Sequence, residues 1–360
     1  MTNPFKKTPI VPSTDLAEGK LFCSRIRAWN RCKRYHYYTY IRNLDPTSMR
    51  VPFYLGSTLH HGVMLMYQGK KLKDIQASVK DFQKAYKARH SIHPEMAQDM
   101  MVNDAIGQGM IAGYYGRYKE FAKSVKVVSA EQSFQTMLDV GGVKIPFIGT
   151  VDLMYGIDTK ERKGLWIEDH KTATGVFDNT LNTLPMNMQM GMYPAIVKRA
   201  LGVEISGIVY SIVIKPTIRL KQNESVSEFM DRIQFEYREN PEKYFFQEFI
   251  PYNPGTVKRI WDDMMLTAAD MVRWYESMTE EELLKPESWP RNEAGCFPYG
   301  FKRENACPFY DLCRDGEKAA FHKLQYFQQR VGTDRGATII SKNKPSKVKD
   351  KLLKLIGGIR

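Results

Sequence analysis

The sequence predicts an α/β fold, and three observations lead to that class. Residues 125–138, 140–156 and 163–173 carry β-branched and aromatic side chains at every second position, which is typical of strands. A helical pattern over 185–200 follows them, and then an apolar strand over 205–215. The order strand, strand, strand, helix, strand builds an α/β core. The composition, 43% hydrophobic over 360 residues, supplies enough apolar side chains to bury such a core.

The chain before this core is predicted to be a helical lobe over 21–125, preceded by a weakly ordered lead-in over 1–20. Apolar residues at helical spacing run through 59–121. Basic and aromatic residues alternate from Arg25 to Tyr40 on a predicted helix. These side chains could offer stacking faces and phosphate contacts to a nucleic-acid strand, or they could all pack in the core.

The remainder of the chain is predicted to contain helices over 224–238 and 254–278, a Pro-, Gly- and Cys-rich loop over 285–315, and a helix over 316–330. We therefore assign the core and its following helices to 126–284 and a Cys-rich segment to 285–330. The interval 331–360 is predicted to be a mobile basic tail that adds phosphate affinity without sequence preference.

The charge balance makes nucleic acid the first partner to consider. Lys plus Arg number 53 against 40 Asp plus Glu, a net charge of +13 that attracts polyanions, although such charge can also serve solubility alone. No apolar run reaches the roughly 18 residues that a membrane span needs, and the first residues contain no hydrophobic signal core. Five Cys are too few for a disulfide scaffold in a chain of this length. We expect a soluble, cytoplasmic protein without a membrane partner.

Two carboxylates and an amine are predicted to converge on neighbouring strands. Asp152 lies on one strand, and Asp169 and Lys171 lie two positions apart on the next, so their side chains share a face. A divalent cation between the carboxylates would remove their repulsion, and oxygen ligands select Mg²⁺ or Mn²⁺. With a neighbouring ammonium, this arrangement suits phosphodiester hydrolysis. The alternative is an ordinary cross-strand salt bridge.

The order and spacing of four short motifs resemble a known family. The segments GTVD at 149–152 and DHKT at 169–172 resemble motifs II and III of the PD-(D/E)xK nuclease superfamily. GSTLH at 56–60 and QMGMY at 189–193 are similar to the Gly-x-x-x-His and Gln-x-x-x-Tyr motifs of its RecB-like branch. The resemblance covers roughly residues 20–315 and implies a restriction-endonuclease-like core, a mixed central sheet flanked by helices. It also implies an inserted N-terminal helical lobe and a C-terminal Cys-rich clasp.

The resemblance also implies roles for individual residues. The ligands of Mg²⁺ or Mn²⁺ would be His60, Asp152 and Asp169, with the backbone carbonyl of His170 as a further ligand and the Glu131 carboxylate near the ion. Lys171 would position or activate the attacking water, and Gln189 and Tyr193 would steady the DNA or the Lys. The His170 side chain is expected to face away from the ion.

Four of the Cys residues are predicted to form a second metal centre. Cys32 stands near one end of the chain, and Cys296, Cys307 and Cys313 stand near the other, so a shared centre would clasp the two ends. Four thiolates suit either zinc or a [4Fe-4S] cluster, and spacing does not decide between them. The resemblance to AddB-type and CRISPR-adaptation exonucleases implies the [4Fe-4S] cluster. This chain departs from them in having ten residues between Cys296 and Cys307, where relatives often have two.

The function predicted from these features is a Mg²⁺- or Mn²⁺-dependent deoxyribonuclease, an exonuclease on single-stranded or frayed DNA ends in recombination, repair or phage replication. The alternatives are a non-cleaving DNA-binding accessory protein and a structure-specific endonuclease. The sequence contains no Gly-x-x-x-x-Gly-Lys-Ser/Thr motif, so a helicase or recombination partner would have to supply any motor. If the gene belongs to a phage, the compartment is the host cytoplasm.

Overall fold

The computed structural model describes residues 20–47, 50–88, 90, 97–176, 182–298, 306–319, 327–329, 340–341 and 347–359. The chain forms two compact units. The first comprises Met1–Thr47, Thr136–Ile148 and Trp261–Arg335, and the second Ser48–Gln135, Gly149–Ile260 and Gly336–Arg360. The predicted lead-in over 1–20 lies outside the described residues except for Lys20. The division into five segments made from the sequence stays a prediction.

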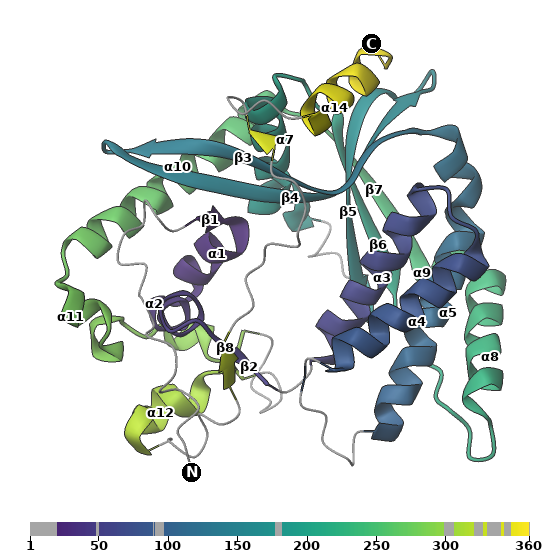
Figure 1. Cartoon of the computed structure of the whole chain (residues 1–360), viewed down its shortest axis with the longest axis horizontal. Helices are drawn as coiled ribbons and strands as arrows, with labels where there is room; N and C mark the ends of the chain where they lie inside the picture. The colour runs from purple at the N-terminus through teal and green to yellow at the C-terminus, as the bar shows by residue number, and fades with distance from the viewer. Residues whose placement is uncertain are drawn as a thin grey trace. The chain divides into compact units, whose positions relative to one another are not determined.

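A mixed sheet forms the centre of the fold (Figure 1). Within the described residues it has seven strands in the order β7-β6-β5-β4-β3-β9, with β1 paired to β4. The strands are β1 Leu21–Phe22, β3 Lys126–Val140, β4 Val143–Asp158, β5 Lys163–Ala173, β6 Gly207–Ile214, β7 Phe245–Pro251 and β9 Ile340–Ser341. β5 runs antiparallel to β4 and parallel to β6, and β6 runs antiparallel to β7. The predicted α/β fold with a mixed sheet is confirmed.

The three predicted successive strands are β3, β4 and β5. Gly141 and Gly142 join β3 to β4 with φ angles of 60° and 88°, a conformation that a two-residue hairpin turn requires and that glycine adopts at no steric cost. From Leu165 to His170 every residue of β5 is buried, so side chains on both of its faces pack against helices. The same buried segment of β5 therefore contains both apolar core residues and the polar residues Asp169 and His170.

Helices of the second unit cover the two faces of β5 separately. These helices are α3 Val51–Tyr67, α4 Leu72–Ala88, α5 Ala97–Ser124, α7 Met188–Leu201, α8 Val226–Glu239 and α9 Pro241–Tyr244. α3, α4, α5 and α8 lie together beside the sheet (Figure 1). Tyr114 of α5 contacts His170 on one face of β5, and Tyr193 of α7 contacts Asp169 on the other. Asn187 begins α7 by accepting a hydrogen bond from the Gln189 backbone N–H, which fixes the first turn.

The first unit joins the early and late parts of the chain. Its helices are α1 Cys23–Arg31, α2 Lys33–His36, the π-helical turn Tyr37–Ile41, α11 Glu280–Leu283, α12 Tyr310–Ala319 and most of α10, Pro254–Glu276; β2 Leu44–Pro46 pairs with β8 Phe327–Gln329. The aromatic side chains predicted as stacking faces are largely core. Trp29, Tyr37 and Tyr38 are at most 3% exposed, so they stabilise this unit and are not available to a nucleic acid.

One prediction for the C-terminal part is wrong in its bounds. The helix predicted over 316–330 is α12, which begins at Tyr310 and is described as far as Ala319; Gly316 interrupts it with φ 77° and ψ 156°, and Phe327–Gln329 is a strand. Positions 320–326 lie outside the described residues. The segment predicted as a mobile basic tail contains α14, Lys347–Gly357, in which Leu352 and Ile356 are buried, and its mobility stays a prediction. These two side chains, four positions apart, form an apolar stripe among the lysines.

Among the described residues, no helix has both the length and the apolar character needed to cross a membrane.

Candidate active site

The predicted carboxylate and amine groups lie on β4 and β5 in the second unit. The antiparallel pairing of these strands runs from Asp158 opposite Lys163 to Leu153 opposite Glu168, and Asp152 and Asp169 come directly after its end. Both carboxylates are buried, at 9% and 0% exposed. Two acidic groups at this depth need positive partners, because an uncompensated buried charge costs several kcal/mol.

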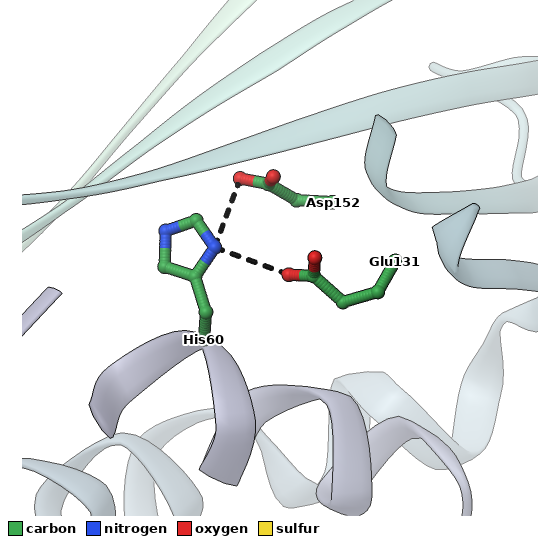
Figure 2. Close-up of side chains that lie close together, drawn as sticks. All are labelled: His60, Glu131 and Asp152. Atoms are coloured by element: carbon green, nitrogen blue, oxygen red, sulfur yellow. Dashed lines mark hydrogen bonds and ion pairs between the residues drawn. The ribbon is translucent and has the colours of Figure 1, made fainter. Parts of the chain in front are cut away.

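A histidine and two carboxylates meet at one point beside β4 (Figure 2). His60 reaches from α3, and its Nδ1 lies 3.2 Å from Glu131 Oε1 of β3 and 3.5 Å from Asp152 Oδ2. Ligand atoms of these three residues all lie within 4.8 Å of one another. An imidazole nitrogen with two carboxylates is a donor set that Mg²⁺ or Mn²⁺ accepts, so the residues fit such an ion.

Glu131 is held in an unusual backbone conformation. Its φ is 50°, in the left-handed region that L-residues other than Asn and Asp rarely adopt, although it stands inside β3. Such a conformation costs of the order of 1–2 kcal/mol and persists only where the surroundings impose it. The residue with this positive φ is the one that contacts His60, a detail that nothing in the sequence signals.

Asp169 belongs to a second set of contacts in the same site. Its Oδ2 pairs with Lys171 Nζ at 2.6 Å. Its Oδ1 accepts hydrogen bonds from Gln189 Nε2 at 3.1 Å and from the Tyr193 hydroxyl at 3.4 Å, and Gln189 also hydrogen-bonds Tyr193. The QMGMY segment thus presents both side chains from one face of α7, as its four-residue spacing predicts.

The pKa shifts show that the acidic and basic groups of the site stabilise each other's charged forms against the cost of burial. Burial alone would lower the pKa of His60, but the Asp152 carboxylate and then Glu131 raise it to about 9. Burial raises and the His60 and Lys171 charges lower the pKa of Asp152, which ends below its usual range. Burial and the neighbouring Asp152 raise the pKa of Asp169. Burial opposes the ammonium form of Lys171, yet Asp169 and Asp152 raise its pKa. Two cations therefore balance the buried carboxylates.

The structure brings all the residues predicted for this site into one region, with one difference in grouping. Glu131 stands in the close group with His60 and Asp152, whereas Asp169 faces Lys171 and α7. The backbone carbonyl of His170 lies 2.9 Å from His60 Nε2, and the His170 side chain is turned to the opposite face of β5. The roles of these residues stay predictions. The sequence predicted no functional role for Tyr114 and Glu168, which contact the His170 side chain.

The four predicted thiol ligands lie in the first unit. Cys32 stands between α1 and α2, and its Sγ accepts a hydrogen bond from the Asn292 backbone N–H at 3.4 Å. The Cys307 N–H donates to the Cys296 carbonyl at 2.6 Å, and Cys313 lies on α12. A Cβ at Gly295 would lie only 2.9 Å from the Arg31 carbonyl oxygen, so glycine allows the two chain segments to approach.

The thiols influence one another's ionisation. Burial first, and then the proximity of Cys307, Cys32 and Cys296, raise the pKa of Cys313 to about 12. Burial raises the pKa of Cys307 to about 11, with Cys32 and Cys296 adding to it. In the absence of a metal these thiols stay neutral at pH 7, whereas a metal centre binds thiolates and would compensate their charge. Among the described residues, only His60, Glu131 and Asp152 place three candidate ligand atoms within 4.8 Å of one another, so the thiols do not form such a group, and a metal centre on them stays a prediction.

Comparison with known proteins identifies the family. The sequence profile of the PD-(D/E)XK nuclease superfamily matches residues 21–314, which is most of the chain. The chain belongs to the PD-(D/E)XK nuclease superfamily. Membership in this superfamily implies a hydrolytic nuclease. Among proteins with curated functions, none matches the chain.

Two solved structures are distantly similar to this PD-(D/E)XK nuclease. One is a protein from Eubacterium rectale described as a candidate exonuclease, with a TM-score of 0.47 and 12% identity over 83% of this chain and 95% of that one. The other is the protein SSO0001, with a TM-score of 0.24 and 12% identity over 67% of this chain and 84% of that one. At these values neither adds to the family assignment.

Proposed function

We propose that this protein is a Mg²⁺- or Mn²⁺-dependent deoxyribonuclease that acts as an exonuclease on single-stranded or frayed DNA ends. The single observation that carries the proposal is the meeting of His60, Glu131 and Asp152, with ligand atoms within 4.8 Å of one another. The ion pair between Asp169 and Lys171 lies beside this group, and the Lys171 charge lowers the pKa of Asp152. Together these residues supply the acids and the amine that the reaction needs. A non-cleaving accessory protein would not require this combination.

The cation would be held by His60, Glu131 and Asp152. The Asp152 carboxylate also raises the pKa of Asp169, so a cation beside Asp152 would relieve the repulsion between the two. When bound, the cation would neutralise charge on a phosphoryl oxygen and lower the pKa of water. Metal ligation requires a neutral imidazole nitrogen. His60 can provide one, because its Nε2 lies 2.9 Å from the His170 carbonyl and can keep its proton there while Nδ1 faces the carboxylates.

Lys171 is suited to donating a hydrogen bond and is not suited to removing a proton. Asp169 and Asp152 raise its pKa, so it remains an ammonium at neutral pH. Its side chain is 35% exposed, and it can reach a phosphate oxygen or orient water while Asp169 holds its direction. Gln189 and Tyr193 fix Asp169 from α7 and so fix Lys171 indirectly. The net charge of +13 favours a polyanionic substrate such as DNA.

The test compares the wild-type protein with Lys171→Ala on end-labelled single-stranded, duplex, nicked circular and closed circular DNA in the presence of Mn²⁺. We expect cleavage from free ends only, and a loss of at least about 100-fold in Lys171→Ala, the size expected when one transition-state donor is removed. Lys163→Ala is the matched control, because Lys163 lies on the same strand and is exposed. Cleavage of closed circles would indicate an endonuclease. DNA binding without any cleavage would contradict the proposal.

We also propose that Cys32, Cys296, Cys307 and Cys313 hold a [4Fe-4S] cluster, with zinc as the alternative. Support comes from the hydrogen bonds that join residues 31–34 to residues 289–295, and from the rise that Cys307, Cys32 and Cys296 cause in the pKa of Cys313. A metal centre there would serve as a structural link, because its binding energy becomes folding energy of the two chain segments. It lies outside the set of groups that would contact the phosphate.

A further inference from the structure

The face of β5 turned away from the carboxylates carries a buried polar network. Residues alternate along the strand, so Asp169 and Lys171 face α7, whereas Glu168 and His170 face α5. Glu168 and His170 are 0% and 1% exposed. An acidic side chain so deep in a sheet needs polar partners, because an unpaired buried charge costs several kcal/mol, and here they gather at one of its two oxygens, Oε1.

Four side chains build the network. His170 Nε2 lies 2.9 Å from the Tyr114 hydroxyl and 3.2 Å from Glu168 Oε1. The same Glu168 oxygen accepts a hydrogen bond from Gln247 Nε2 of β7 at 3.0 Å and lies 3.5 Å from the Tyr114 hydroxyl. Contacts from α5, β5 and β7 therefore restrict both the ring orientation of His170 and the position of its backbone.

The backbone of His170 connects this network to the proposed metal site. The N–H and C=O of one strand residue point to the same neighbouring strand, and for His170 that neighbour is β4. Pairing of β4 with β5 ends at Leu153 opposite Glu168, so His170 lies just beyond this ladder. Its N–H donates to Asp152 Oδ2 at 3.0 Å, and its C=O lies 2.9 Å from His60 Nε2. One peptide residue thus bonds two of the three clustered ligands.

We propose that Tyr114, Glu168 and Gln247 are positioning residues that hold the His170 backbone in place, so that its N–H and C=O orient Asp152 and His60 toward a divalent cation. The inference deepens the proposed function and rests on it. The role is that of outer hydrogen-bond partners in metal sites, whose removal typically weakens metal affinity 10–100-fold. Here the outer partners act across the sheet, through the main chain and not through a direct bond to the ligand side chain.

The test titrates Mn²⁺ into the full-length protein without DNA and follows the free ion by electron paramagnetic resonance. Tyr114→Phe removes one hydroxyl and keeps the ring, and we expect it to raise the Mn²⁺ dissociation constant about 10-fold or more. In cleavage assays at low Mn²⁺ its kcat should fall with KM for DNA unchanged, and excess Mn²⁺ should restore kcat. Gln247→Leu should weaken Mn²⁺ binding in the same direction.

Tyr118→Phe is the matched control, because Tyr118 is buried one turn further along α5 and packs against Tyr114. Its Mn²⁺ affinity should equal that of the wild type. A Tyr114→Phe protein that loses thermal stability but binds Mn²⁺ within twofold of the wild type would overturn the inference and leave a purely structural network. A wild type that binds Mn²⁺ but cleaves no DNA would overturn the proposed function alone. A wild type that binds no Mn²⁺ would overturn both.

Discussion

The carboxylate site (His60, Glu131, Asp152, Asp169 and Lys171) and the thiol cluster (Cys32, Cys296, Cys307 and Cys313) both unite residues distant in sequence, but by different means. The carboxylate site stands on the long strands β3, β4 and β5 and on a helix, so the sheet itself fixes most of its groups. The thiol cluster stands on helix ends and turns, held by side chain to backbone hydrogen bonds such as Arg31 to the Gly295 carbonyl at 2.9 Å.

Charge sharpens this contrast. The carboxylate site contains its own cations, because the pKa values of His60 and Lys171 are both raised by the neighbouring acids. It can therefore fold before an ion arrives. In the thiol cluster, burial and the neighbouring thiols outweigh the charges of Arg31 and Arg34, so the pKa values of Cys307 and Cys313 are raised and both thiols stay neutral. On the two proposals above, metal would contribute mainly to catalysis in the second unit and mainly to folding in the first.

The largest expected effect concerns the metal centre proposed for the first unit. Apparent binding energies of structural metal sites reach about 10 kcal/mol, comparable to the whole stability of a domain. We therefore expect Cys313→Ser to lose iron, colour and most of its soluble yield when purified anaerobically beside a brown wild type. Cys23→Ser is the matched control and should retain all three. A colourless, iron-free wild type would exclude the cluster, and stoichiometric zinc in it would indicate the alternative.

A smaller effect is expected for the second unit, where the free energy of unfolding should depend on pH. The pKa of His60 is about 9 in the folded protein, against about 6.5 for an unperturbed histidine. A raised pKa gives stability that is fully present below pH 6.5 and is lost as pH rises through 9. With divalent ions chelated, the free energy of unfolding should fall over that interval by up to about 3 kcal/mol, at about 1.4 kcal/mol per pKa unit.

The measurement for this prediction is urea unfolding at a series of pH values from 6 to 9.5, on the wild type and on His60→Gln. Glutamine cannot be charged, so the decline specific to His60 should be absent from the variant. The depressed pKa of Asp152 contributes no slope in this interval, because that group stays ionised throughout it. Parallel pH profiles for the two proteins would mean that His60 is not the cation that balances Asp152 and Glu131.

The sequence predicted those parts of the molecule that depend on local pattern. Period-two alternation located β3, β4 and β5, and the two-residue spacing of Asp169 and Lys171 placed both on one face of β5. The contributions of His60 and Gln189 came from motif resemblance, because no local rule links α3 or α7 to the strands. Their contacts with His170 and Asp169 depend on how the helices pack.

The features that the sequence did not predict, or predicted wrongly, depend on contacts between segments that are distant in sequence. Tyr114 and His170 are 56 positions apart, and nothing in either segment signals their hydrogen bond. The lysines of α14 suggested a solvated tail, whereas burial of Leu352 and Ile356 makes that segment a packed helix. The alternation of basic and aromatic residues in α1 and α2 has the same appearance in a core as on a nucleic-acid surface, and burial of Trp29 distinguishes the two.

The smallest expected effect is the release of backbone strain at Glu131. It tests whether the carboxylate site holds Glu131 beside His60 at a cost in stability. The Glu131 φ of 50° costs of the order of 1–2 kcal/mol for glutamate but less for asparagine, which tolerates the left-handed region. Glu131→Asn and Glu131→Gln both remove the carboxylate, so both should weaken Mn²⁺ binding and cleavage. Only Glu131→Asn relieves the strain, so its free energy of unfolding should exceed that of Glu131→Gln by roughly 0.5–1 kcal/mol. Equal stability would show that β3 adopts this conformation without cost, and that Glu131 reaches His60 without stored strain.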